Sequence, residues 1–299
     1  MPVLRASDAQ LNQLMTQSLQ KNNLDINFVF EQMSTGKRIQ SLSDDPIDSI
    51  NLLNLERQLT AIDQYKTNVD NVKTNLSIQE EALQGIVDGF KRVRDLLLWA
   101  KNGNLTDADR LGILTEIDAL NEGATSLLNT QDENGIYLFS GTLSDQASIV
   151  GDNNIGFTLQ GNTDLRLVNV AKGINVQSNY TAQQMFDLGA GQNVFESIRL
   201  LNQGGVINIA GIDGAISDLD VTLGNILENI TRMGGQQNAL DLIKSNHVDN
   251  ETLTTKVSSE IEQLDYAEAS VQLTNLQNAL QATQASFVTI TGMSLFDRL

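Results

Sequence analysis

The sequence has 299 residues, no cysteine, and a net charge of −18 from 19 basic and 37 acidic side chains. The lack of cysteine excludes disulfides and thiolate metal sites. An acidic surface repels nucleic acid and anionic membranes, and no apolar run approaches the ~20 residues of a membrane span, so neither nucleic acid binding nor membrane insertion is expected.

The first predicted element is a helix over residues 3–33, because apolar side chains recur there at steps mostly of three and four. The opposite face carries Gln, Asn and Ser rather than charged residues. A helix with so narrow an apolar stripe is marginal alone and needs a partner. The stripe consists of Leu11, Met15, Leu19, Ile26, Val29 and Met33.

Residues 34–45 interrupt this helix, and Pro46 begins the next one. Gly36 suits the left-handed conformation that ends helices. Asp45 is a suitable N-cap before a proline in the first helical position, so the second helix is predicted from 46 to about Lys101. Thr106 and Asp109 form a weak capping box for a third helix, which ends before residue 132.

The pattern then changes from helical periodicity to short strand-like runs separated by Gly, Asn and Asp, which is typical of hairpins. The runs cover residues 136–139, 156–160, 165–170 and 174–176. They predict a small β-rich insertion over 136–190, followed by a short helix from Val194 to Leu201.

The last segment, from Ile212 to the C-terminus, returns to steps of three and four, as in coiled coils. Gly234 and Gly235 lie inside it and cost about 2 kcal/mol relative to alanines, so a bend or break is predicted there. Because the first and last helices both carry a narrow apolar stripe, they are expected to pair with each other. The last stripe includes Leu276, Leu280, Phe287 and Ile290.

The predicted fold is therefore mainly α: a long antiparallel helical bundle or coiled coil formed by both chain ends, with a small β-rich inserted domain. We expect a terminal coiled-coil domain of residues 1–45 and 255–299, disordered in the free monomer. Residues 46–135 and 191–254 would form a helical core domain, and residues 136–190 the inserted domain.

No pattern in the sequence matches a known catalytic or binding motif. We therefore predict no catalytic, cofactor-binding or metal-binding residue, and the chain is not expected to be an enzyme. His247 is the single histidine and is interpreted as a packing or surface residue, since it lacks the partners that zinc binding or nucleophilic catalysis needs. The glycines of 189–191 match no phosphate-binding motif. An acidic face on the last helix is interpreted as solvated or as contacting other subunits; it comprises Glu260, Glu262, Asp265 and Glu268.

Three segments resemble the flagellin superfamily. Residues 31–39 (EQMSTGKRI) with 43–46 (SDDP) are similar to its N-terminal helix–loop–helix, residues 258–299 to its C-terminal helix, and residues 132–141 (DENGIYLFSG) to the entry into its variable domain. Within that superfamily the chain is more similar to the hook-associated proteins of the hook–filament junction than to filament flagellins. Pro46 after the acidic pair, the ending SLFDRL and the small insertion favour this resemblance.

The resemblance implies a structural subunit that joins hook to filament as a ring of copies, between the other hook-associated junction protein and flagellin. It also implies type III export, help from an export chaperone, and a place in the extracellular flagellum. The chain lacks the apolar core of a secretory signal peptide, which is compatible with such export. Three alternatives remain open at this point: a filament flagellin, a non-flagellar coiled-coil scaffold, and an enzyme housed in the insertion.

Overall fold

The structure is a computed structural model that describes residues 3–296, with side chains described for residue 10 and residues 13–289. The chain divides into two units. The terminal unit comprises Met1–Thr60 and Glu251–Leu299, and the central unit comprises Ala61–Asn250. Each unit is described by itself below.

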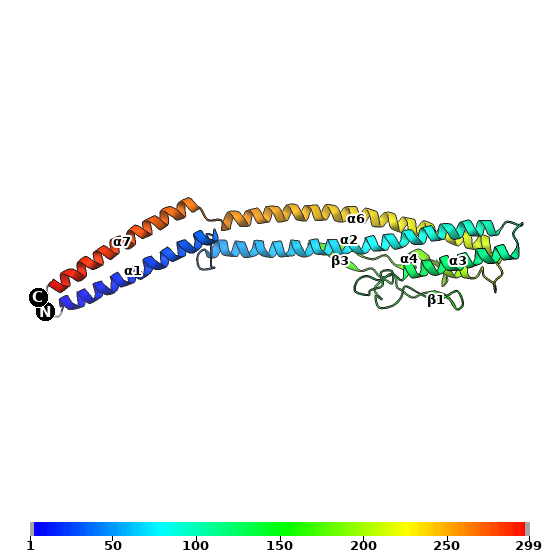
Figure 1. Cartoon of the computed structure of the whole chain (residues 1–299), viewed down its shortest axis with the longest axis horizontal. Helices are drawn as coiled ribbons and strands as arrows, with labels where there is room; N and C mark the ends of the chain where they lie inside the picture. The colour runs from blue at the N-terminus through cyan, green and yellow to red at the C-terminus, as the bar shows by residue number, and fades with distance from the viewer. Residues whose placement is uncertain (1–2, 297–299) are drawn as a thin grey trace. The chain divides into compact units, whose positions relative to one another are not determined.

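In the terminal unit, helix α1 (Val3–Thr35) lies beside helix α7 (Tyr266–Phe296) (Figure 1). The two run antiparallel: Tyr266 Oη donates to the carbonyl oxygen of Met33 at 3.1 Å, and Asn22 Nδ2 contacts Thr283 Oγ1 at 3.5 Å. The predicted pairing of the first and last helices is therefore confirmed.

Two further helices contribute to both units. Helix α2 spans Pro46–Ala100, and Asp45 Oδ1 accepts from the Asp48 amide at 3.1 Å, so the predicted helix start is confirmed. Helix α6 spans Ile212–Glu262. In the central unit α2 and α6 run antiparallel, with ion pairs between them such as Arg94–Asp220 at 2.8 Å and Lys244–Asp70 at 2.6 Å.

The break predicted as one possibility at Gly234 and Gly235 is wrong, because α6 is continuous through both residues. Met233 and Leu240 on either side are fully buried, and this packing outweighs the low helix propensity of glycine. The helix ends instead at residues 263–265. There the Leu264 amide donates to the Gly36 carbonyl at 3.0 Å, and Asp265 Oδ1 accepts from the Ala267 amide at 2.8 Å as the N-cap of α7.

Helix α3 (Asp107–Leu128) begins with the predicted capping box. Thr106 Oγ1 accepts from the Asp109 amide at 3.2 Å, and Asp109 Oδ2 accepts from the Thr106 amide at 3.0 Å. Asp109 lies in the first turn, where its charge complements the helix dipole. Its Oδ2 also accepts from the Thr106 hydroxyl at 2.6 Å, and this bond, followed by that from the Thr106 amide, lowers the pKa of the Asp109 carboxyl.

The insertion consists of three separate antiparallel strand pairs rather than one sheet. Helix α5 (Val194–Arg199) confirms the predicted short helix, and the runs predicted at 156–160, 165–170 and 174–176 correspond to β2, β3 and β4. The short helix α4 (Ala182–Phe186), strand β1 and the third strand pair were not predicted. The pairs are β1 (Ile149–Asp152) with β2 (Gly156–Leu159), β3 (Leu167–Ala171) with β4 (Ile174–Gln177), and β5 (Asp187–Gly189) with β6 (Gln192–Asn193). A 3₁₀ turn, η1 (Ile209–Gly211), precedes α6.

The strand predicted at 136–139 is wrong. Asp132 Oδ1 accepts from the Asn134 and Ile136 amides at 2.8 and 2.9 Å, which fixes a tight turn before this run. Leu138 and Phe139 are both buried in the core, so the run does not alternate between core and solvent as a half-buried strand does. The apolar character of residues 136–139 therefore reflects an irregular segment that is buried, and not a strand.

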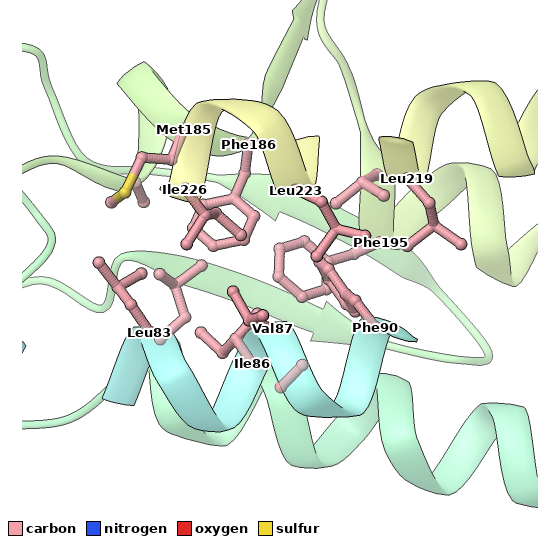
Figure 2. Close-up of a cluster of buried hydrophobic side chains, with 14 of the residues drawn as sticks. Leu83, Ile86, Val87, Phe90, Met185, Phe186, Phe195, Leu219, Leu223 and Ile226 are labelled. Carbon is pink, nitrogen blue, oxygen red and sulfur yellow. The ribbon is translucent and has the colours of Figure 1, made fainter. Parts of the chain in front are cut away.

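The core of the central unit lies where α2 and α6 meet α4 and α5 (Figure 2). The rings of Phe90, Phe186 and Phe195 form a cluster with centroids 5.2–6.3 Å apart. Their separations suit tilted and edge-to-face contacts between rings. The labelled aliphatic neighbours are Leu83, Ile86, Val87, Met185, Leu219, Leu223 and Ile226.

Side chains of the long helices hold the insertion in place by capping its backbone. Gln79 is fully buried, and its Oε1 accepts from the Tyr180 amide at 2.9 Å. His247 is buried, stacks on Tyr65 with centroids 5.6 Å apart, and lies 2.7 Å through Nε2 from the Val170 carbonyl oxygen. The histidine thus supports the β3–β4 hairpin.

Candidate assembly surface

The terminal unit buries few apolar side chains. Among its described residues, the buried apolar side chains are Val29, Ile39, Leu264 and Ala269. Helices α1 and α7 have 33 and 31 residues, so their pairing is thinly supported compared with the core of the central unit. Helices of this kind gain most of their stability from packing, and the cluster between α1 and α7 is small.

The residues of the two predicted stripes face one another only in part. Val29 is buried, and Met33, Leu273 and Leu276 pack around it half-buried. Met15, Leu19, Ile26, Leu280 and Phe287 are also half-buried. The side chains of Leu11 and Ile290 lie outside the described residues.

The four helix ends of the terminal unit meet in a hydrogen-bonded segment, which we call the joint: residues 36–48 and 261–266. Its two halves form a bridge like that of an antiparallel sheet. The Arg38 amide donates to the Glu262 carbonyl at 2.7 Å, and the Leu264 amide donates to the Gly36 carbonyl at 3.0 Å. Gly36 has a φ of +73°, which a residue with a side chain rarely adopts.

Arg38 is the hub of the joint. Its guanidinium contacts Asp45 Oδ2 at 3.1 Å and Asp48 Oδ2 at 2.5 Å, and donates to the Ile261 carbonyl at 3.2 Å. The cation therefore lies beside the negative C-terminal end of α6 and the acidic N-terminal turn of α2. Hydrogen bonds from the Asp48 amide and Arg38 hold the pKa of Asp45 below its usual range, while Asp48 and Asp45 raise that of Arg38.

The predicted acidic face is partly occupied by contacts of this joint. Glu262 forms an ion pair with Lys37 at 2.5 Å, and Asp265 caps α7. Glu260 and Glu268 are exposed. The roles of Asp265 and Arg38 were not predicted: the Asp-x-x-Glu spacing at 265–268 is a capping signal, but no signal in the sequence pairs Arg38 with α6.

A second apolar surface of the terminal unit is open to solvent on the first turns of α2. Ile47 is 75% exposed and Ile50 is 55% exposed, and Leu42 and Leu53 beside them are also exposed. Ser49, between Ile47 and Ile50 in the sequence, is buried. Clustered exposed apolar side chains mark surfaces that contact other molecules.

The described residues offer no comparable site for chemistry. Within residues 3–296, no group of three or more His, Asp or Glu is placed to hold a metal ion, and no helix combines the length and apolar character needed to cross a membrane. The turn at 189–191 joins β5 to β6. The features that require explanation are the paired helices, their joint and the exposed apolar surface.

Comparison with known proteins identifies the family to which the chain belongs. The bacterial flagellin N-terminal helical region matches residues 7–144. A solved Vibrio parahaemolyticus chain, described as a flagellar hook-associated protein, is 42% identical with a TM-score of 0.68, and the match covers 74% of this chain and 100% of that one. The chain belongs to the family of flagellar hook-associated proteins. It is accordingly a structural protein of the flagellum and not an enzyme.

Curated relatives agree with this family and also show its link to flagellins. Flagellar hook-associated protein 3 of Escherichia coli is 27% identical over 288 residues, covering 89% of this chain and 90% of its own length. Flagellin FlaB2 of Treponema pallidum is 25% identical over 272 residues, covering 90% and 89%. The match to hook-associated proteins therefore extends over nearly the whole chain.

Proposed function

We propose that this hook-associated protein joins hook to filament in the bacterial flagellum, as a ring of copies held together by the terminal unit. The name of the Escherichia coli relative supports the position, and the thin packing of α1 against α7 supports the assembly mode. Copies would supply for one another the packing that a single terminal unit lacks.

The same observations support a terminal domain (residues 1–45 and 255–299) that becomes ordered only on assembly. A chain that cannot bury enough apolar surface alone pays the entropy of ordering when it binds. The helical core (46–135 and 191–254) and the β-rich insertion (136–190) would fold beforehand. The family resemblance implies type III export with an export chaperone and a final place outside the cell, and a chain without disulfides suits passage through a narrow channel in unfolded form.

The partners we propose are further copies of this chain, the other hook-associated junction protein on one side and flagellin on the other. The resemblance to Flagellin FlaB2 favours one alternative, a filament subunit. A purified filament subunit would polymerise into long filaments by itself, whereas a junction protein would not. Electron microscopy of the purified chain at high concentration separates the two.

The observation that carries the proposal is the half-buried α7 stripe, and Leu276→Asp tests it. Leu276 packs on the cluster around Val29. A buried unpaired carboxylate costs several kcal/mol per subunit in the assembled ring. A strain carrying Leu276→Asp as its sole copy should lose motility and release flagellin into the medium. Gln277→Asp is the matched control, since it adds the same charge at the next, exposed position.

Thermal unfolding of the purified Leu276→Asp monomer completes the test. We expect its main transition to match that of the parent chain, because that transition reports the central unit. Normal swimming by the variant strain would refute the assembly role of the stripe. A collapsed monomer transition would instead show that α7 is already packed before assembly.

A further inference from the structure

Two Asn-Gly pairs occur in the sequence, Asn102-Gly103 and Asn134-Gly135, and both lie at exposed turns. In such a pair the glycine amide nitrogen can attack the asparagine side-chain carbonyl carbon, because glycine presents no side chain that hinders the approach. The reaction needs a free amide and a backbone able to bend toward the side chain. The two pairs differ in these requirements.

Asn102-Gly103 lies in the open connection between α2 and α3. The Asn102 amide donates to the Trp99 carbonyl at 2.9 Å, which ends the helix, but the Gly103 amide has no hydrogen-bond partner among the described residues. Asn102 Oδ1 is held only by a long contact of 3.4 Å with the Asn104 amide. A Cβ placed on Gly103 or on Gly135 would meet nothing within 4 Å, so the two pairs differ in their hydrogen bonds and not in the space around the glycine.

Asn134-Gly135 is equally exposed but closed by hydrogen bonds. The Gly135 amide donates to the Asp132 carbonyl at 3.0 Å. Asp132 Oδ1 accepts from the amides of Asn134 and Ile136 at 2.8 and 2.9 Å. The attacking nitrogen is thus already used, and the turn must open before it can react.

We propose that Asn102 is a site of spontaneous deamidation and that Asn134 is protected. The Gly103 nitrogen loses its proton and forms a bond to Asn102 Cγ, the Cγ–Nδ2 bond breaks, and ammonia leaves with the proton. Water then opens the cyclic imide at either carbonyl and gives aspartate or isoaspartate. Water is the sole co-reactant, and no atom is oxidised or reduced.

The two products affect their surroundings differently. Arg110 Nη2 donates to the Asn102 carbonyl oxygen at 3.2 Å, and Arg110 Nη1 donates to the Ala100 carbonyl at 3.0 Å. Conversion to aspartate therefore places a carboxylate at residue 102, near the Arg110 guanidinium, and leaves the backbone unchanged. Isoaspartate adds a methylene to the main chain between α2 and α3, which displaces the carbonyl that Arg110 binds.

The test is to incubate the full-length protein at mildly alkaline pH and to follow both sites by peptide mass, since each deamidation adds about 1 Da. Digestion in heavy-oxygen water labels any deamidation that occurs during digestion, which matters because trypsin cleaves after Lys101 and frees Asn102. We expect Asn102 to convert at least about tenfold faster than Asn134. The Gly135 amide must first break its hydrogen bond, whereas the Gly103 amide has none to break among the described residues. In denaturant the two rates should become equal.

Asp132→Ala is the decisive variant: it keeps the backbone carbonyl that binds the Gly135 amide but removes the carboxylate whose two bonds, to the Asn134 and Ile136 amides, hold the turn closed, while Asn102 stays as it is. We expect the Asn134 rate to rise toward that of Asn102. Asn102→Gln should remove the fast site and leave the slow one. Equal rates at the two sites in the folded parent chain, or faster conversion at Asn134, would overturn the proposal, as would unchanged protection of Asn134 in Asp132→Ala.

Discussion

Replacing Arg38 by glutamine should loosen both halves of the joint together. The side chain makes two ion pairs and one bond to a helix carbonyl, and it is 41% exposed. Exposed ion pairs contribute about 0.2–1 kcal/mol each, and a hydrogen bond about 0.5–1.5 kcal/mol. After allowing for solvent screening, we expect the local opening free energy to fall by about 1–2 kcal/mol, equivalent to roughly 5–30-fold in the opening equilibrium.

Hydrogen exchange of the assembled protein, in which the terminal domain is ordered, is the appropriate assay, because mass spectrometry then reads local opening directly from backbone amides. The amides of residue 38 and Leu264 bond across the joint, one from each half. Both should exchange faster in Arg38→Gln by a similar factor, while amides of the central unit should not change. Lys37→Gln is the matched control: it removes one ion pair, with Glu262, from the neighbouring position.

The control should produce a smaller change than Arg38→Gln, because a single exposed pair contributes little. Equal acceleration in the two variants would refute the assignment of Arg38 as the hub. Acceleration confined to residues 36–45 would also refute it, since the guanidinium would then not hold the end of α6.

Three further predictions concern other contacts. In the free chain, trypsin should cut after Lys37 and Lys256 in the terminal unit well before Lys66 in the central unit; equal protection on digestion gels would argue against ends that are disordered before assembly. The pKa of Asp45 is depressed from 3.8, so its stabilising contribution should be complete above that pH and be lost as the pH falls below it; in the assembled protein the protection factors of the joint amides, corrected for intrinsic exchange at each pH, should fall there in the parent chain and less in Asp45→Asn. Burial raises the pKa of Asp118, so its charged form is disfavoured and Asp118→Asn should raise the melting temperature at neutral pH, with a gain that shrinks in acid; a lower melting temperature would show that the carboxylate is needed by Asn202.

Much of the helical architecture was predictable, because it rests on local rules. The capping box at Thr106 and the start at Pro46 depend on residues within a few positions of each other, and spacing alone reveals them. The thin stripes of α1 and α7 also predicted a pair, since neither helix could be stable alone.

The remaining features depend on contacts that spacing does not encode. The end of α6 is fixed by the Leu264 amide reaching Gly36, a residue far away in the sequence, while the helix stays continuous through the two glycines that suggested a break because Met233 and Leu240 on either side are buried. The irregular run at 136–139 has the composition of a strand, yet its carbonyl groups bond to separate parts of the chain: the Arg166 guanidinium donates to the Tyr137 carbonyl at 2.7 Å, and the Ala182 amide donates to the Phe139 carbonyl at 2.8 Å. Without a partner strand, composition alone does not make a sheet.

The joint also imposes an order on how the chain acquires its structure during synthesis. Arg38 meets Ile261 across a separation of 223 residues, and Met33 meets Tyr266 across 233. Contacts this distant carry a large loop-closure cost and form late, whereas the central unit draws its contacts from residues 61–250. A ribosome must therefore release almost the entire polypeptide before the first 35 residues can meet their partner helix. Until then the N-terminal segment has no native partner, so for most of translation it must be tolerated, shielded or left extended.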